Sequence, residues 1–215
     1  MIITLDGPAG SGKSTTARAL AKKLGGVYLD TGAMYRSVTL VALESGVNIG
    51  DAAKLDTIAR TIVIDFQEST NGQKVFVNGR DITAAIRTPE VDANVSTVSA
   101  HPCVREKMVA QQRNIAKKHK TVIVEGRDTG SVVFPNADHK FFLSANPAER
   151  GKRRALQTGQ AADKVQDIAK QIVERDSKDS SRSISPLVVP IGAVEIDNSH
   201  LNLDETLHKI LQFLA

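Results

Sequence analysis

Cysteine and aromatic residues are scarce in this chain of 215 residues, and each shortage excludes a class of protein. Its one cysteine, Cys103, excludes an intrachain disulfide, so we expect a reducing compartment, the cytoplasm. Six Phe, two Tyr and no Trp are too few for a platform that stacks single-stranded nucleic acid. The first residues become acidic at Asp6, too early for a signal peptide. Apolar runs fall short of the ~18 residues that a membrane span needs. We therefore expect neither nucleic acid nor a membrane as partner.

The charge balance is mildly basic. Lys and Arg number 28 against 24 Asp and Glu, which gives a formal net charge of +4. With 41% hydrophobic and 24% charged residues, the composition is that of an ordinary globular domain. The length fits one domain, and the basic excess is compatible with a partner that carries phosphate.

Short apolar runs alternate with helical patterns along most of the chain. Five runs have the length of buried strands, at residues 2–5, 27–30, 121–125, 140–144 and 194–197. Apolar spacing predicts helices at about residues 14–24, 33–45, 51–60, 102–119, 146–157, 166–178 and 203–214, with another start at Thr88-Pro89. This alternation predicts an α/β fold, a parallel sheet flanked by helices.

The middle of the chain departs from that alternation. Segments rich in β-formers at residues 62–66 and 74–77 flank Asn71-Gly72, and Asn78-Gly79 follows the second segment. Asn-Gly between such segments is a strong hairpin signal. We therefore predict a small antiparallel insert at about residues 63–82.

A glycine-rich segment lies between the first predicted strand and the first predicted helix. Residues 7–14 read Gly-Pro-Ala-Gly-Ser-Gly-Lys-Ser and match the P-loop pattern G-x-x-x-x-G-K-[ST]. In such loops the backbone N–H groups surround a phosphate, the lysine reaches the β- and γ-phosphates, and the hydroxyl holds Mg²⁺. The pattern predicts that the phosphates of a nucleotide bind, with Mg²⁺ at Ser14, to Gly7, Pro8, Ala9, Gly10, Ser11, Gly12, Lys13, Ser14 and Thr15.

Arginines indicate which kind of P-loop protein this is. The guanine-reading Asn-Lys-x-Asp segment of GTPases is missing from the sequence. Glu125 ends an apolar run as a Walker B acid does, but Gly126-Arg127-Asp128 follows at once. Arginines at loops and helix ends suit a small phosphotransferase with an anionic acceptor: Arg36, Arg105, Arg127, Arg150, Arg153, Arg154, Arg175 and Arg182. We expect Arg18, Arg60 and Arg113 to be solvated surface charges.

Five further segments, with the P-loop, resemble the bacterial cytidylate kinase family of nucleoside-monophosphate kinases. They are residues 29–36 (Leu-Asp-Thr-Gly-Ala-Met-Tyr-Arg), 86–91, 125–135 (from Glu-Gly-Arg-Asp-Thr-Gly), 174–182 and Pro186-Leu187. The resemblance covers nearly the whole chain. It implies a monomer that transfers phosphate from ATP to CMP or dCMP. It also implies one domain over residues 1–215, with a core at about 1–62, 83–150 and 185–215, a monophosphate-binding insert at 63–82 and a helical lid at 150–184.

The resemblance also implies roles for particular residues. Lys13, Arg127, Arg175 and Arg182 would be catalytic, and Arg153 and Arg154 would close over ATP with the lid. The residues expected to bind CMP are Thr31, Tyr35, Arg36, Ser96, Arg105, Arg127, Asp128, Arg175 and Asp179. Spacing by itself adds that Arg175, Asp179 and Arg182 would share one face if they lie on one helix.

Two alternatives stay open at this point. Another small P-loop kinase would act on UMP, dTMP or another phosphorylated acceptor. A non-enzymatic nucleotide-binding factor associated with RNA would also carry a P-loop and a basic charge balance, although the scarcity of aromatic residues disfavours it.

Overall fold

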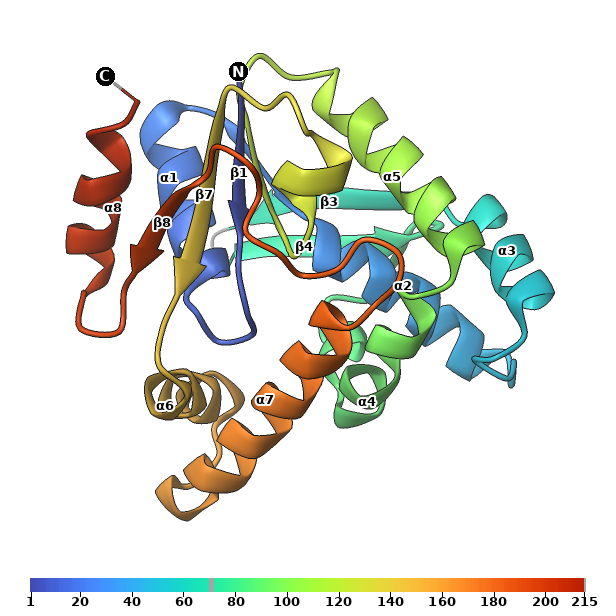
Figure 1. The fold of residues 1–215 in the computed structure, drawn as a ribbon. Helices are drawn as coiled ribbons and strands as arrows, with labels where there is room; N and C mark the ends of the chain where they lie inside the picture. Colours follow the sequence, from blue (N-terminus) through green and yellow to red (C-terminus); the bar gives the residue numbers. More distant parts are fainter. Residues whose placement is uncertain (70–71, 215) are drawn as a thin grey trace. The chain divides into compact units, whose positions relative to one another are not determined.

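Five parallel strands form the main sheet of the computed structural model, which describes residues 1–69 and 72–214 and, within them, all side chains except that of Ala162 (Figure 1). The order across the sheet is β2 (Val27–Asp30), β6 (Val122–Gly126), β1 (Ile2–Asp6), β7 (His139–Ser144) and β8 (Val194–Asp197). Every neighbouring pair is parallel. Side by side, β1 and β6 therefore end at the same edge of the sheet, where Asp6 is opposite Gly126.

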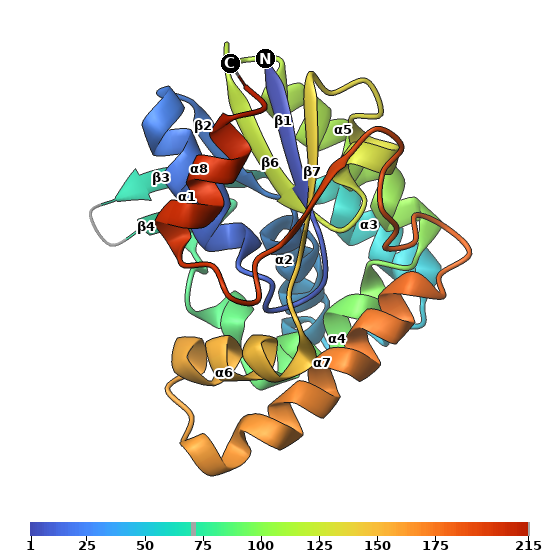
Figure 2. The ribbon, with the colours of Figure 1, turned by 60° about the vertical axis from the view of Figure 1, so that its left-hand side comes forward.

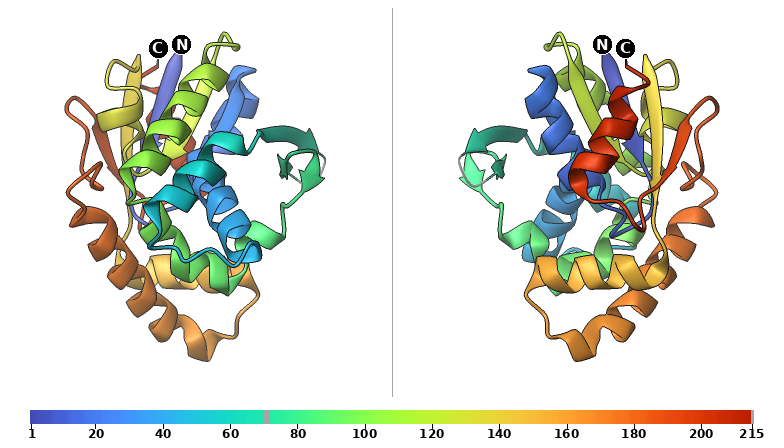
Figure 3. Two further views of the ribbon diagram at one scale, coloured as in Figure 1. Left: turned by 90° about the vertical axis from the view of Figure 1, so that its right-hand side faces the viewer. Right: turned by 90° about the vertical axis from the view of Figure 1, so that its left-hand side faces the viewer.

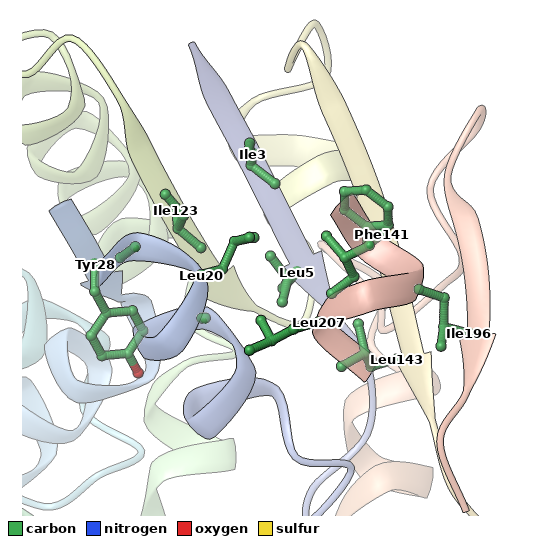
Figure 4. Close-up of a cluster of buried hydrophobic side chains, with 12 residues drawn as sticks. Ile3, Leu5, Leu20, Tyr28, Ile123, Phe141, Leu143, Ile196 and Leu207 are labelled. Carbon is green, nitrogen blue, oxygen red and sulfur yellow. The ribbon is translucent and has the colours of Figure 1, made fainter. Parts of the chain in front are cut away.

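The two faces of β1 serve different purposes. Ile3 and Leu5 point into a core formed with α1 (Lys13–Leu24) and α8 (Leu203–Leu211), which cover one face of the sheet (Figures 2 and 4). Because side chains alternate along a strand, Thr4 and Asp6 point to the opposite face. A single turn of π-helix, Thr129–Val133, packs against β1 there.

Two helices follow β7 in the sequence. They are α6 (Pro147–Thr158) and α7 (Val165–Ser180), joined by a short 3₁₀ turn, Ala162–Lys164. Ala155 packs against Ile168 and Ile172 between them, and both helices lie beyond the ends of β1 and β7 (Figure 3). This helix pair occupies the segment expected to form a lid.

The chain divides into two compact units, residues 1–30 with 113–215, and residues 31–112. The second unit holds an antiparallel sheet of β3 (Ile64–Ser69), β4 (Gly72–Val77) and β5 (Arg80–Asp81). Its other elements are α2 (Thr31–Glu44), α3 (Ala52–Thr61), a 3₁₀ turn (Ala85–Arg87), α4 (Pro89–Val98) and most of α5 (Pro102–Ala116).

The predicted α/β architecture and the antiparallel insert are confirmed. Asn78 and Gly79 form the turn between β4 and β5 with positive φ, whereas Asn71 of the other predicted turn lies outside the described residues. The closing helix ends at Leu211, three residues before the predicted end. Within the described part of the chain, helices long and apolar enough to cross a bilayer are lacking.

Candidate active site

The phosphate loop, residues 7–14, runs from the end of β1 into the first turn of α1. Gly7, Gly10 and Gly12 have φ values of 147°, 74° and 89°. A Cβ atom would lie 2.0 Å from the carbonyl oxygen of Leu143 if built on Gly7, and 2.8 Å from that of Arg150 if built on Gly10. Glycine is therefore required by both the backbone angles and the lack of room. A loop of this shape at a helix N-terminus attracts anions through the helix dipole and backbone N–H groups.

Lys13 lies buried inside that loop. Its Nζ donates hydrogen bonds to the carbonyl oxygen of Pro8 at 2.6 Å and to Ser11 Oγ at 3.3 Å. Burial, followed by the positive charge of Arg127, lowers the pKa of Lys13 to about 7. An anion bound at the loop would favour the charged form, so the lysine is suited to a phosphate.

Ser14, at the start of α1, is tied to the end of β6. Its hydroxyl donates to Glu125 Oε1 at 2.8 Å, and Tyr28 Oη donates to the other oxygen of the same carboxylate. The donated proton fixes the direction of the Ser14 hydroxyl and leaves its oxygen able to accept a cation. The sequence interpretation gave Glu125 no role because Gly-Arg-Asp follows it. The signal that could have revealed this role is that Glu125 is the acidic residue at the end of an apolar run.

Arg127 and Arg182 meet on one carboxylate. Asp179 Oδ2 accepts from Arg127 Nε at 3.2 Å, and Asp179 Oδ1 pairs with Arg182. The side chains of Asp179, Arg182 and Arg127 are only 3%, 9% and 18% exposed, so water screens these ion pairs weakly. Asp179, near the end of α7, thus holds together the residue after β6 and a residue beyond α7.

The spacing of Arg175, Asp179 and Arg182 predicted that all three would share one helix face, but only the first two lie on a helix. Arg175 precedes Asp179 by one turn of α7, but the helix ends at Ser180. Arg182 therefore reaches Asp179 from beyond the helix. Asp128 follows Arg127 directly, is buried, and leads into the π-helical turn.

Side chains from α6 and α7 hold the first half of the phosphate loop. Asp176 Oδ1 accepts from the N–H of Ala9 at 2.9 Å, and Arg150 donates to the carbonyl oxygen of Ala9 at 3.1 Å. Arg150 and Asp176 also form an ion pair with each other. Both helices are therefore fastened to the loop backbone, a role that the sequence did not reveal for Asp176.

The segment after β8 also makes a hydrogen bond to the phosphate loop. Asn198 Nδ2 donates to the carbonyl oxygen of Ser11 at 2.8 Å. Arg153 of α6 donates to Asn198 Oδ1 at 3.0 Å and to its backbone oxygen at 2.8 Å. Arg154 instead donates to Gln157 on its own helix. Of the two arginines expected near ATP, Arg153 is thus tied through Asn198 to the phosphate loop.

The second unit brings together its own group of predicted residues. Arg36 of α2 donates to the carbonyl oxygen of Ile86 at 2.8 Å and pairs with Asp92 of α4. The guanidinium of Arg105 lies 5.1 Å from the ring centre of Tyr35, within cation–π distance. Thr31 is the first residue of α2, and Ser96 is on α4.

The arginines expected on the surface divide into two groups. Arg18 donates to the carbonyl oxygen of Ser14 and Arg60 pairs with Asp56, each on its own helix. Arg113 instead donates to the backbone oxygens of Val133 at 2.9 Å and Val132 at 3.1 Å. Arg113 is exposed, as expected for a surface charge, and it also anchors the end of the π-helical turn.

A metal site preformed by side chains is missing from residues 1–69 and 72–214. They contain no cluster of three or more His, Cys, Asp and Glu residues suited to an ion. A divalent cation at this site would depend on Ser14, with Glu125 behind it, and on the oxygens of a bound phosphate.

Comparison with known proteins gives matches over the full length. The sequence model of the family described as cytidylate kinase matches residues 3–215. A cytidylate kinase of Lactobacillus gasseri is 45% identical over 216 residues, which cover 100% of this chain and 94% of that protein. A cytidylate kinase of Bacillus cereus is 42% identical, covering 99% and 95%.

Several relatives are longer proteins. The bifunctional pantoate ligase/cytidylate kinase of Parasynechococcus marenigrum is 46% identical over 98% of this chain, which spans only 43% of its length.

Solved structures support the fold alone. A shikimate kinase from Bacteroides thetaiotaomicron superposes with a TM-score of 0.52 at 13% identity, covering 100% of this chain and 98% of that one. A shikimate kinase from Acinetobacter baumannii gives a TM-score of 0.50 at 15% identity, covering 99% and 92%.

Proposed function

The chain belongs to the cytidylate kinase family, and from this premise we propose that it transfers the γ-phosphoryl group of ATP to the phosphate of CMP or dCMP. The products are ADP and CDP or dCDP. The observation that carries the proposal is the buried Lys13 inside a glycine loop, in the same unit as the arginines on Asp179.

The acceptor needs no general base. A phosphate monoester has a second pKa of about 6, so its oxygens are already ionised at neutral pH. Catalysis then reduces to holding the two nucleotides in line and neutralising the charge of the moving phosphoryl group. A lysine and several arginines, rather than a catalytic triad, supply that chemistry.

On the donor side, the phosphate loop binds the triphosphate of ATP and Lys13 reaches its terminal phosphates. Mg²⁺, when bound, adds positive charge beside the phosphate oxygens. Ser14 would hold it, because its proton is committed to Glu125 and its oxygen is left to accept. Glu125 then orients the ligand rather than serving as a base.

On the acceptor side, Arg127 and Arg36 bind the CMP phosphate. Asp128, Arg105 and Ser96 read cytosine, whose N4 amino group donates and whose O2 accepts. Uracil presents O4 in place of N4, so the carboxylate of Asp128 would face an acceptor and disfavour UMP. The remaining CMP contacts are assigned to Thr31, Tyr35, Arg175 and Asp179.

The helix pair α6 and α7 is assigned as a lid over ATP, within the segment at about residues 150–184. That segment includes Arg153 and Arg154 of α6 and, beyond the end of α7, Arg182. Closure would exclude water, which otherwise competes with CMP for the γ-phosphoryl group. The antiparallel insert near residues 63–82 is assigned to the monophosphate side.

The test of the reaction is ADP release with CMP, dCMP, UMP, dTMP and AMP measured side by side. We expect turnover with CMP and dCMP and kcat/KM at least about tenfold lower with UMP, as a mispaired buried polar group costs about 1–3 kcal/mol. A preference for UMP, dTMP or AMP would favour another small kinase. Failure with every monophosphate, combined with salt-sensitive RNA binding, would favour the RNA-associated factor.

Asp128→Asn tests the base-reading assignment. Its amide nitrogen can donate to O4 of uracil, so the ratio of CMP to UMP efficiency should fall about tenfold while the KM for ATP stays within about twofold. An unchanged ratio would remove Asp128 from base recognition and leave the phosphoryl transfer itself untouched.

A further inference from the structure

Asp6 is a completely buried carboxylate that the proposed mechanism does not use. It is the last residue of β1 and directly precedes Gly7 of the phosphate loop. Asp6 Oδ1 accepts from the N–H of Thr129 at 2.8 Å and from its hydroxyl at 2.9 Å, while Asp6 Oδ2 accepts from the N–H of Gly130 at 2.7 Å. One side chain thus satisfies three donors of the π-helical turn.

These bonds fix the segment that carries Arg127 and Asp128. We call Arg127 and Asp128 the dyad. In the sheet, the backbone of Asp6 is in register with Gly126, the residue before the dyad. The side chain of Asp6 binds Thr129 and Gly130, the residues after it. The two-residue dyad is therefore held at both ends by the same residue of β1.

Close packing leaves this turn little freedom. A Cβ atom on Gly130 would lie 2.7 Å from Thr4 Oγ1 and 3.3 Å from Asp6 Oδ2, so the turn rests directly on the face of β1. Arg113 holds the far end of the turn through the carbonyl oxygens of Val132 and Val133. A shift of the Asp6 carboxylate would accordingly be transmitted to the backbone of the dyad.

The chemistry of the group suits a positioning role. The three hydrogen bonds that Asp6 accepts from the turn come from neutral donors, and burial, reinforced by the nearby charge of Asp128, raises the pKa of Asp6 to about 6. Above that pH both oxygens accept, which an amide or an alanine cannot reproduce. A simple structural cap would not require so costly a buried charge.

We propose that Asp6 is a positioning residue for phosphoryl transfer: its carboxylate sets the placement of Arg127 and Asp128 relative to the phosphate loop that begins at the next residue. This rests on the proposed function, in which the loop holds the donor and the dyad holds the acceptor. One residue therefore joins the two halves of the reaction through a strand end and a turn.

The experiment compares Asp6→Asn with two conservative variants of its neighbours. Asp6→Asn keeps the shape but sets an amide donor against the Gly130 N–H. Thr129→Val removes only the hydroxyl bond and keeps both backbone bonds. Thr4→Val is the matched control, because Thr4 is buried on the same face of β1 and its hydroxyl makes no hydrogen bond within the described residues.

We expect Asp6→Asn to raise the KM and the calorimetric Kd for CMP at least about tenfold and to lower kcat, with the KM for ATP within about twofold. Thr129→Val should raise the KM for CMP two- to threefold, and Thr4→Val should match the wild type. If Asp6→Asn does not fold, the difference between Thr129→Val and Thr4→Val still decides the question.

Three results would overturn the role of Asp6. They are a lower unfolding temperature in Asp6→Asn with wild-type kinetic constants, equal losses for CMP and ATP, or identical constants in Thr129→Val and Thr4→Val. A wild-type enzyme that does not act on CMP would instead refute the proposed function, so the two failures are distinguishable.

Discussion

The phosphate loop and the cluster around Asp179 are assembled by opposite means. The loop is a run of eight consecutive residues whose shape is set by three glycines with positive φ. The cluster joins Arg127 and Asp179, which lie 52 positions apart, through side-chain ion pairs. Backbone N–H groups keep their places when side chains change, whereas a cluster of side chains depends on each of its members.

The two regions also treat charge differently. The amino group of Lys13 donates to a carbonyl and a hydroxyl oxygen, and burial lowers its pKa. Arg127 and Arg182 share the carboxylate of Asp179, which neutralises part of their charge. The comparison teaches that one region holds a buried lysine whose charged form is disfavoured until a ligand binds, while the other needs an internal counter-ion to stay assembled.

The largest effect should come from Lys13→Met. We expect kcat to fall at least about 10²-fold, the loss typical of one charge-stabilising donor. The folded chain holds Lys13 at a pKa of about 7, below the ordinary 10.5, so folding at pH 8 requires the lysine to give up its proton, which costs free energy. Replacing it should therefore raise the unfolding temperature, measured by calorimetry without nucleotide. A variant that loses both activity and stability would show that Lys13, like the Asp179 cluster, stabilises the fold.

An intermediate effect should come from Asp179→Asn. Two poorly exposed arginines lose their counter-ion, and breaking a buried pair costs about 3–5 kcal/mol. We expect a lower unfolding temperature and a tenfold to hundredfold lower kcat/KM for CMP. The matched control is Asp56→Asn, since its partner Arg60 is 59% exposed and such surface pairs contribute about 0–1 kcal/mol. Equal effects of the two substitutions would show that burial of the cluster does not matter.

The smallest effect is a proton taken up when ATP binds. With a pKa of about 7, Lys13 is mostly neutral at pH 8, and a bound triphosphate should restore its charge. We expect uptake approaching one proton at pH 8, read from binding enthalpies in buffers of different ionisation enthalpy. Lys13→Arg, charged at every pH tested, should bind without this uptake. The same uptake in Lys13→Arg would assign the proton to another group.

Much of the fold was predictable because its signals are local. All five strands of the main sheet were predicted to within two residues, and Asp51, Thr88, Asn146 and Asn202 cap the helices that follow them. The π-helical turn at Thr129–Val133 was not predicted, because it depends on the distant carboxylate of Asp6. Arg182 likewise lies outside the helix that its spacing suggested.

In the candidate site, too, the features with local signals were predictable and those that depend on distant contacts were not. The glycine loop, Lys13 and Ser14 were evident because the chemistry of a P-loop is contained in eight consecutive residues. Glu125, Asp176, Arg150 and Asn198 were missed as partners of that loop, because their contacts span 111 to 187 positions. The roles assigned by resemblance to the other nucleotide-binding residues stay predictions.

Sequence by itself determined the class of reaction, the family and the order of strands and helices along the chain, since these depend on residue types at short spacings. Only the tertiary structure decided which carboxylate partners which donor: Glu125 with Ser14, Asp176 with Ala9, Asp179 with Arg127, and Asp6 with the turn at Thr129. The physical reason is that any of 24 acidic side chains can accept from any donor in an unfolded chain. The folding of β1, β6 and α7 beside one another selects these pairs.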